Sequence, residues 1–116
     1  MCGKDCEGFY FCNHYSAAST NPATKKFVET YSAEYKGTPD DVAALSYDSI
    51  GLLKEAIVKA GKTDREAVRE ALSAIRDFTG VTGNMRFTQG SGDPAKSAVI
   101  MQIKDGKFVW VADVNP

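Results

Sequence analysis

A polar cluster interrupts the longest apolar segment of the chain. Ser46, Tyr47, Asp48 and Ser49 follow one another within residues 37–61, where apolar side chains otherwise recur at three- and four-residue steps. Tyrosine combines an apolar ring with a hydroxyl group, and a carboxylate accepts several hydrogen bonds, so this pair could help to bind a polar ligand. Two plainer interpretations stay open: Tyr47 as a core aromatic residue, and Asp48 as a solvated or supporting residue.

The cysteines and the single histidine are concentrated at the beginning of the chain. Cys2, Cys6, Cys12 and His14 are all the residues of these two types in the sequence. Their spacings match no common zinc finger or knuckle, and cysteines so close together do not link distant parts of a chain. The favoured interpretation is two exposed thiols and one small buried residue, with no metal site.

Motifs that would support catalysis are missing from the sequence. It contains no G-x-S-x-G element, no glycine-rich phosphate loop and no paired-histidine metal motif. Cys12 and His14 stand two residues apart on a predicted strand, and therefore lack the opposed geometry of a nucleophile and its base. We predict no catalytic residue, no cofactor and no enzymatic activity.

Length and charge narrow the class of protein further. With 116 residues, 43% of them hydrophobic and 25% charged, the chain fits one globular domain covering residues 1–116. Its net charge of −1 argues against a nucleic-acid partner, which would require an excess of Lys and Arg. The first residues, M-C-G-K-D-C-E-G, lack the layout of a signal peptide, so we expect a cytoplasmic protein or one whose natural beginning has been removed.

Helix-start signals divide the middle of the chain into three predicted helices. An Asn-Pro pair at residues 21–22 should begin the first helix, and a Thr-Pro pair at residues 38–39 the central one. Gly61 should end the central helix in the left-handed conformation. The third helix is expected to begin at the capping box T-D-R-E, in which Thr63 caps the helix and Glu66 reaches back.

Strands are predicted on both sides of the helices. Residues 7–15 are rich in aromatic side chains that alternate between two faces, which favours a strand covered on both sides. A short strand is expected at residues 84–88, and two longer ones at 97–103 and 107–114. The Asp-Gly pair at 105–106 predicts a type I′ hairpin turn between the last two.

The predicted order of elements is strand, three helices, short strand, hairpin, which places the chain in the α/β class. One strand followed by three helices cannot complete a parallel sheet, so the chain reads as part of a larger fold. We therefore expect helices flanking a small mixed sheet with a C-terminal β-hairpin. An uncovered sheet edge could also pair with a second copy, which makes a self-associating interaction domain the alternative function.

Five segments, in order along the chain, carry a resemblance to a known family. They read E-G-F-Y-F-C-N-H-Y-S, N-P-A-T-K-K-F-V-E-T-Y, T-P-D-D-V-A-A-L-S-Y-D-S-I-G-L-L-K-E-A-I, F-T-G-V-T-G-N-M-R-F and G-D-P-A-K-S-A-V-I-M-Q-I-K-D-G-K-F-V-W-V. Together they resemble the C-terminal third of the extracellular solute-binding receptors for branched-chain amino acids. These receptors are the type I periplasmic binding proteins of ABC importers.

The resemblance implies a partial αβα sandwich from a two-lobed receptor, whose lobes close on an amino acid and then dock on a membrane permease. It implies a periplasmic or extracellular location for the full-length protein and three crossings of the chain between the lobes. It also suggests ligand-binding residues. Glu7, before a glycine at the start of the first strand, would pair with the ligand ammonium, while Tyr47 and Asp48 would face the cleft from the central helix. Tyr10 is a weaker candidate, and for Glu7 the alternative is a solvated side chain.

Overall fold

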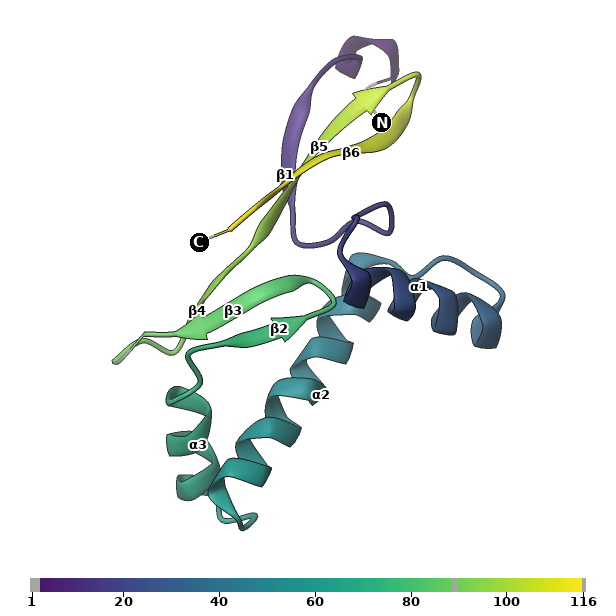
Figure 1. Cartoon of the computed structure of the whole chain (residues 1–116). Helices are drawn as coiled ribbons and strands as arrows, with labels where there is room; N and C mark the ends of the chain where they lie inside the picture. The colour runs from purple at the N-terminus through teal and green to yellow at the C-terminus, as the bar shows by residue number, and fades with distance from the viewer. Residues whose placement is uncertain (1–2, 89, 116) are drawn as a thin grey trace.

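The computed structural model describes residues 3–88 and 90–115, which form two halves joined by a narrow junction (Figure 1). The strand half is an antiparallel sheet in the order β1-β5-β6, and the helical half contains three helices and an antiparallel sheet in the order β2-β3-β4. After a short 3-10 helix at Gly3–Cys6, the elements are β1 (Tyr10–Asn13), α1 (Pro22–Tyr35), α2 (Asp41–Ala60), α3 (Arg65–Ser73), β2 (Phe78–Gly80), β3 (Gly83–Phe87), β4 (Pro94–Lys96), β5 (Ala98–Lys104) and β6 (Lys107–Val114).

The predicted α/β class and the predicted order of the long elements are confirmed. The sheet differs from the expectation in two respects, because it is divided into two separate sheets and every strand pair is antiparallel rather than mixed. Strands β2 and β4, each three residues long, are not among the predicted strands. Such short strands show no periodicity of their own, and their pairing with β3 defines them.

Helix α2 begins two residues later than predicted. Asp40, not Thr38, is the N-cap, and its Oδ1 accepts a hydrogen bond of 2.8 Å from the backbone N–H of Ala43. An aspartate at this position satisfies a free helix N–H and also places negative charge at the positive end of the helix dipole. The predicted end is confirmed, since Gly61 adopts a φ of 66° and its N–H bonds to the carbonyl of Ile57.

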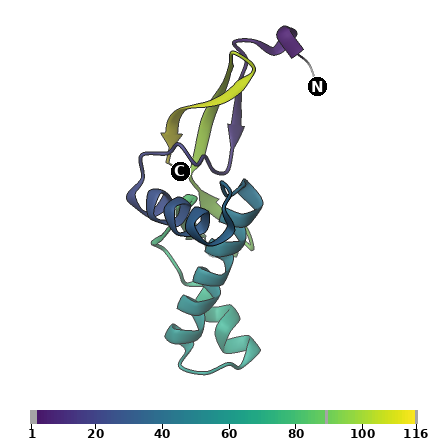
Figure 2. The same cartoon turned by 90° about the vertical axis from the view of Figure 1, so that its right-hand side faces the viewer.

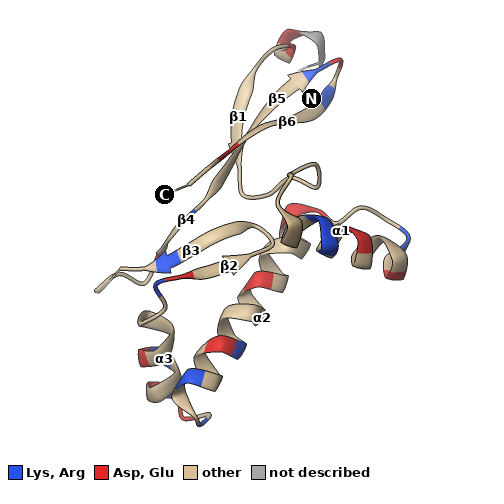
Figure 3. Ribbon diagram, viewed as in Figure 1, with Lys and Arg blue, Asp and Glu red and all other residues tan. Residues whose placement is uncertain are grey.

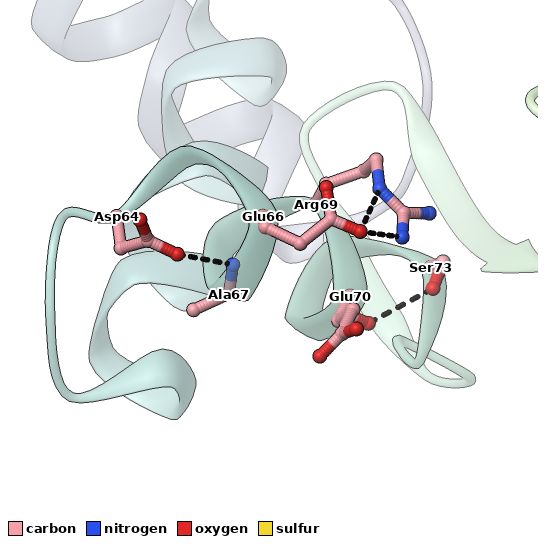
Figure 4. Close-up of polar contacts among 6 residues, drawn as sticks. All are labelled: Asp64, Glu66, Ala67, Arg69, Glu70 and Ser73. Atoms are coloured by element: carbon pink, nitrogen blue, oxygen red, sulfur yellow. Dashed lines mark hydrogen bonds and ion pairs between the residues drawn. The ribbon is translucent and has the colours of Figure 1, made fainter.

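The predicted capping box of α3 is also wrong, because different residues form the hydrogen bonds at the helix start (Figure 4). Asp64 caps the helix by accepting a hydrogen bond of 3.0 Å from the N–H of Ala67, whereas Thr63 does not. Glu66 instead pairs along the helix with Arg69, one turn later. An ion pair three residues apart competes for the carboxylate that a capping box would direct back to the cap.

The β5–β6 hairpin has the turn that its sequence predicts. Asp105 and Gly106 both have positive φ values, 51° and 71°, and Lys104 stands opposite Lys107. Two consecutive left-handed residues define the type I′ turn, and glycine adopts that conformation without steric cost.

The strand half has little cover of its own. Strand β1 is shorter than the predicted residues 7–15, and the expectation of cover on both faces is wrong for this chain, since Tyr10 is 63% exposed and Phe108 on β6 is 70% exposed. The two views agree that no described helix lies over either face of this sheet (Figure 2). In the helical half, by contrast, Ile75, Ala44 and Ala56 are completely buried.

Candidate functional site

Asp48 lies inside the helical half, although its sequence position suggested a ligand contact. It is 2% exposed, and its carboxylate accepts three hydrogen bonds from the β2–β3 turn. The donors are the N–H of Val81 at 2.7 Å, the N–H of Thr82 at 2.8 Å and the hydroxyl of Thr82 at 2.6 Å. Gly80 packs so closely that a Cβ placed there would lie 2.4 Å from the carboxylate. In this chain Asp48 therefore supports the turn.

Tyr47, the neighbour of Asp48 on α2, faces outward. It is 60% exposed, and its ring lies 4.9 Å from that of Phe27 on α1, measured between centroids. The ring of Phe27 lies 5.8 Å from that of Tyr31, and the ring of Tyr31 lies 4.6 Å from that of Tyr35, again between centroids. Tyr47 thus ends a row of aromatic rings, with one face free for a further contact.

Glu7 and Tyr10 belong to the strand half. The carboxylate of Glu7 accepts hydrogen bonds from both residues of the hairpin turn, from the N–H of Asp105 at 2.8 Å and from that of Gly106 at 3.3 Å. Tyr10 is exposed and stands opposite Gln102 on β5. Glu7 therefore lies at the end of the strand half that is farther from α2 (Figure 1).

The structure thus divides the four predicted ligand residues between the two halves, two in each, and does not gather them in a single cluster. Charged side chains of both signs are interspersed on α1 and α2 (Figure 3). Neither half carries charges of only one sign. The two halves therefore differ in the polar contacts around individual residues and not in the sign of their charge.

The cysteines differ from the expectation. Cys6 is disulfide-bonded, so it is no exposed thiol, and Cys12 is an exposed free thiol where a small buried residue was expected. Cys2 lies outside the described residues. Among residues 3–88 and 90–115, no group of three or more His, Cys, Asp or Glu side chains could hold a metal ion.

The junction between the halves contains a residue that sequence reasoning missed. The Lys96 ammonium donates hydrogen bonds to the carbonyl oxygens of Thr82 at 2.7 Å, Ser97 at 3.0 Å and His14 at 3.1 Å. Its partial burial lowers the pKa of Lys96, and the negative charge of Asp48 partly offsets this effect. A lysine in a loop-like stretch carries no sequence signal for such a role, because two of its three partners are distant in the chain.

A small cavity of about 60 Å³ lies at the junction, with both polar and apolar residues in its wall. Its wall includes the Ser97 hydroxyl, which donates to Asn115 at 3.0 Å, and Ser19, whose hydroxyl donates to Asp113 at 3.1 Å. The two crossings, from β1 to α1 and from β4 to β5, are therefore joined by polar contacts in addition to the apolar packing of Tyr15 against Ala44 and Val81.

Tyr15, at the start of the crossing after β1, is buried with its hydroxyl lacking a hydrogen-bond partner among the described residues. Burial, with a smaller contribution from the negative charge of Asp40, raises the pKa of Tyr15 to about 12. The hydroxyl is consequently held in its neutral form.

Two halves joined by crossing strands, built from helices and antiparallel sheets, place the chain among α/β proteins. The chain belongs to the periplasmic binding protein family, whose model matches residues 1–107. The family consists of non-enzymatic solute-binding proteins, which agrees with the prediction of no catalysis. No helix among the described residues is long and apolar enough to cross a membrane.

Solved structures of this family include close matches to the chain. A leucine-binding protein, LivK, from Thermotoga maritima is 38% identical with a TM-score of 0.81, over 98% of this chain and 33% of its own. LivJ from Streptococcus pneumoniae, a branched-chain amino acid transporter substrate-binding protein in complex with isoleucine, is 30% identical with a TM-score of 0.77, over 92% of this chain and 30% of its own. A substrate-binding protein from Desulfitobacterium hafniense in complex with leucine is 31% identical with a TM-score of 0.79, over 91% and 32%. The chain therefore spans about a third of the length of these relatives.

Proposed function

We propose that this chain is the C-terminal third of the binding component of an ABC importer, and that the complete receptor holds a branched-chain or related amino acid between two lobes. The observation that carries the proposal is the 38% identity to a leucine-binding protein over 98% of the chain. The division into two halves supports it, since a hinged receptor requires one segment that contributes to both lobes.

The ligand contacts in this proposal come from both halves. Tyr47 would supply an aromatic wall from α2, because its ring is exposed and held in place by Phe27. Asp48 would act through the turn that it binds. Glu7 and Tyr10, which lie apart from Tyr47 in this structure, are the proposed contacts of the strand half, and a ligand ammonium at Glu7 would share a carboxylate that already accepts two backbone hydrogen bonds.

The proposal places the full receptor in the periplasm or outside the cell, with a membrane permease as its partner. The disulfide at Cys6 supports this location, because disulfides persist in oxidising compartments and are rare in the cytosol.

Isothermal titration of the full-length receptor with leucine, isoleucine and valine tests the proposed function. We expect saturable binding of at least one of them, weakened by Tyr47→Ala and by Glu7→Gln. Lys62→Ala is the control, since Lys62 is exposed in the turn after α2 and none of the proposed contacts involves it. Absence of heat with every amino acid would contradict the proposal. Titration with 3,4-dihydroxybenzoic acid is a useful further arm, because a relative from Rhodopseudomonas palustris, 25% identical to this chain, was solved in complex with it.

The alternative function, a self-associating interaction domain, rests on the exposed aromatic residues of the edge strands β1 and β6, among them Tyr10 and Phe108. Unpaired strand edges with apolar side chains favour pairing with another copy. Light scattering coupled to size-exclusion chromatography distinguishes the two functions. A monomeric isolated chain at high concentration would exclude the alternative, whereas a stable dimer without amino-acid binding by the full receptor would favour it.

A further inference from the structure

The Lys96 ammonium has a position that surface lysines do not have, because its three hydrogen bonds end on three separate carbonyl groups around the junction. Thr82 belongs to the β2–β3 turn of the helical half, and His14 follows the last residue of β1 in the strand half. Ser97 is the residue between β4 and β5, where the chain passes from one half to the other. One side chain thus contacts both crossings and the turn beside them.

The turn that receives Lys96 is itself rigidly held. Asp48 binds both N–H groups and the hydroxyl of residues 81–82, and the hydroxyl of Thr24 on α1 donates to the Val81 carbonyl at 2.7 Å. Lys96 completes this arrangement by occupying the Thr82 carbonyl. The buried carboxylate and the half-buried ammonium therefore act on the same turn from opposite sides, and their charges are complementary.

Other contacts also reach the junction, among them the buried cluster of Tyr15, Ala44 and Val81. The extensive contacts between elements lie within one half or the other. The Ser19–Asp113 contact is a single hydrogen bond of 3.1 Å, and it lies beside a cavity that leaves space for side chains to move. The Lys96 ammonium offers three charge-assisted hydrogen bonds instead, and these are stronger and more directional than neutral ones. Lys96 therefore adds directional polar contacts to the apolar packing of Tyr15 in setting the relative orientation of the halves.

We propose that Lys96 is a positioning residue for ligand binding, which holds the strand half and the helical half in the orientation that the closed receptor requires. The test below measures the distance between the halves and the affinity for leucine, and only the affinity measurement rests on the proposed function. Lys96 touches no ligand in this account, and it acts through the His14 carbonyl and the Thr82 turn. Removing it should leave each half folded while loosening the junction between them.

The test uses the full-length receptor with Lys96→Met, which keeps much of the side-chain length and removes every hydrogen bond of the ammonium. The matched control is Lys62→Met, at an exposed lysine in the turn after α2. Spin labels at Lys54 and Lys107, exposed positions in the two halves, report the distance between the halves by electron paramagnetic resonance. Because Cys12 is a free exposed thiol, the labelled proteins carry Cys12→Ser.

Without ligand, Lys96→Met should broaden the distribution of distances between the labels, while Lys62→Met should reproduce the parent distribution. With leucine, Lys96→Met should weaken binding by about tenfold, the effect of losing roughly one charge-assisted hydrogen bond in net terms. The thermal unfolding of both variants should remain cooperative. If Lys96→Met fails to fold, Lys96→Arg carries the same prediction to a smaller degree, since its planar donors cannot reach all three carbonyls in the same way.

Unchanged distance distributions in a folded Lys96→Met receptor, together with unchanged affinity, would overturn the inference. A distribution that broadens in a receptor that binds no amino acid would uphold the role of Lys96 at the junction and contradict the proposed function. Weakened binding with an unchanged distribution would also count against the inference, because it would mean that Lys96 acts directly on the ligand.

Discussion

The helical half and the strand half of this chain differ in how fully their side chains are buried and their polar groups are satisfied. In the helical half, Ile75 is fully buried, and the buried carboxylate of Asp48 satisfies three donors of one turn. In the strand half, the hydrogen bonds of β1, β5 and β6 are regular, but Tyr10 and Phe108 remain largely exposed. Besides backbone pairing, the strand half buries few side chains, among them Val99 and Met101 on β5, and additional cover would stabilise it.

The difference agrees with the share of the family that the chain represents. A three-stranded sheet gains its stability mainly by burying one or both faces against another layer. Since the chain spans about a third of its relatives, the missing layer for the strand half is expected in the rest of the receptor. The helical half therefore has the contacts to be stable in the isolated chain, whereas the strand half requires contacts with another layer.

The largest effect is expected from Asp48→Ala. This variant leaves two backbone N–H groups and a hydroxyl without their partner inside the helical half, and each unsatisfied buried group costs about 1–3 kcal/mol. We expect the free energy of unfolding to fall by about 3 kcal/mol or more. Urea unfolding measures it, with Asp93→Ala at an exposed position as the control. An equal, small effect of both variants would contradict the claim that buried polar contacts stabilise the helical half.

Truncation of one apolar side chain in each half sharpens the contrast. Ile75→Ala should lower the free energy of unfolding of the isolated chain by about 2–5 kcal/mol, the usual range for a fully buried residue. Phe108→Ala, in the exposed strand β6, should cost less than about 1 kcal/mol in the isolated chain. In the full-length receptor the cost of Phe108→Ala should increase if the rest of the protein covers this face. A cost that stays the same in both would contradict that cover.

The smallest effect concerns Tyr15. Its folded-state pKa of about 12 lies above the ordinary tyrosine value of 10.0, so the unfolded chain releases this proton first. The stability contributed by the neutral hydroxyl is therefore complete below pH 10 and is lost as the pH rises toward 12. Tyr15→Phe should reduce the loss of stability between these pH values, and at pH 8 it should change stability by less than about 1 kcal/mol, since the hydroxyl has no partner to lose.

Thermal unfolding of Tyr15→Phe and the parent protein at pH 8, 10 and 11 tests this prediction. Tyr35→Phe, at an exposed tyrosine of α1, is the control and should show the pH dependence of the parent protein. A marked loss of stability on Tyr15→Phe at pH 8 would show that the hydroxyl has a partner after all.

Local sequence signals predicted much of the fold and little of the site. The three helices, the hairpin and its Asp105-Gly106 turn depend on neighbours along the chain, and periodicity or turn chemistry reveals them. The predicted cap of α1, Asn21, is confirmed, whereas the N-caps of α2 and α3 lie two residues and one residue later than predicted. Several residues near those two helix starts can accept a hydrogen bond, and only the backbone path decides between them.

The roles of Asp48 and Lys96 could not be predicted in the same way. Asp48 binds a turn 33 residues away, and Lys96 reaches a carbonyl 82 residues away. No pattern in the sequence around either residue encodes such partners. The resemblance to solute-binding receptors identified the family, whereas the division of the four predicted ligand residues between the two halves required the structure.

Hydrogen exchange of the full-length receptor with and without leucine tests the central claim most directly. If the chain contributes to both lobes of an amino-acid receptor, leucine should slow amide exchange at the crossings, near residues 14–16 and 96–98, and on the surface around Tyr47. Exchange inside α3, which lies far from the junction, should change little (Figure 1). Identical exchange with and without leucine, isoleucine or valine, in a folded receptor, would contradict the account.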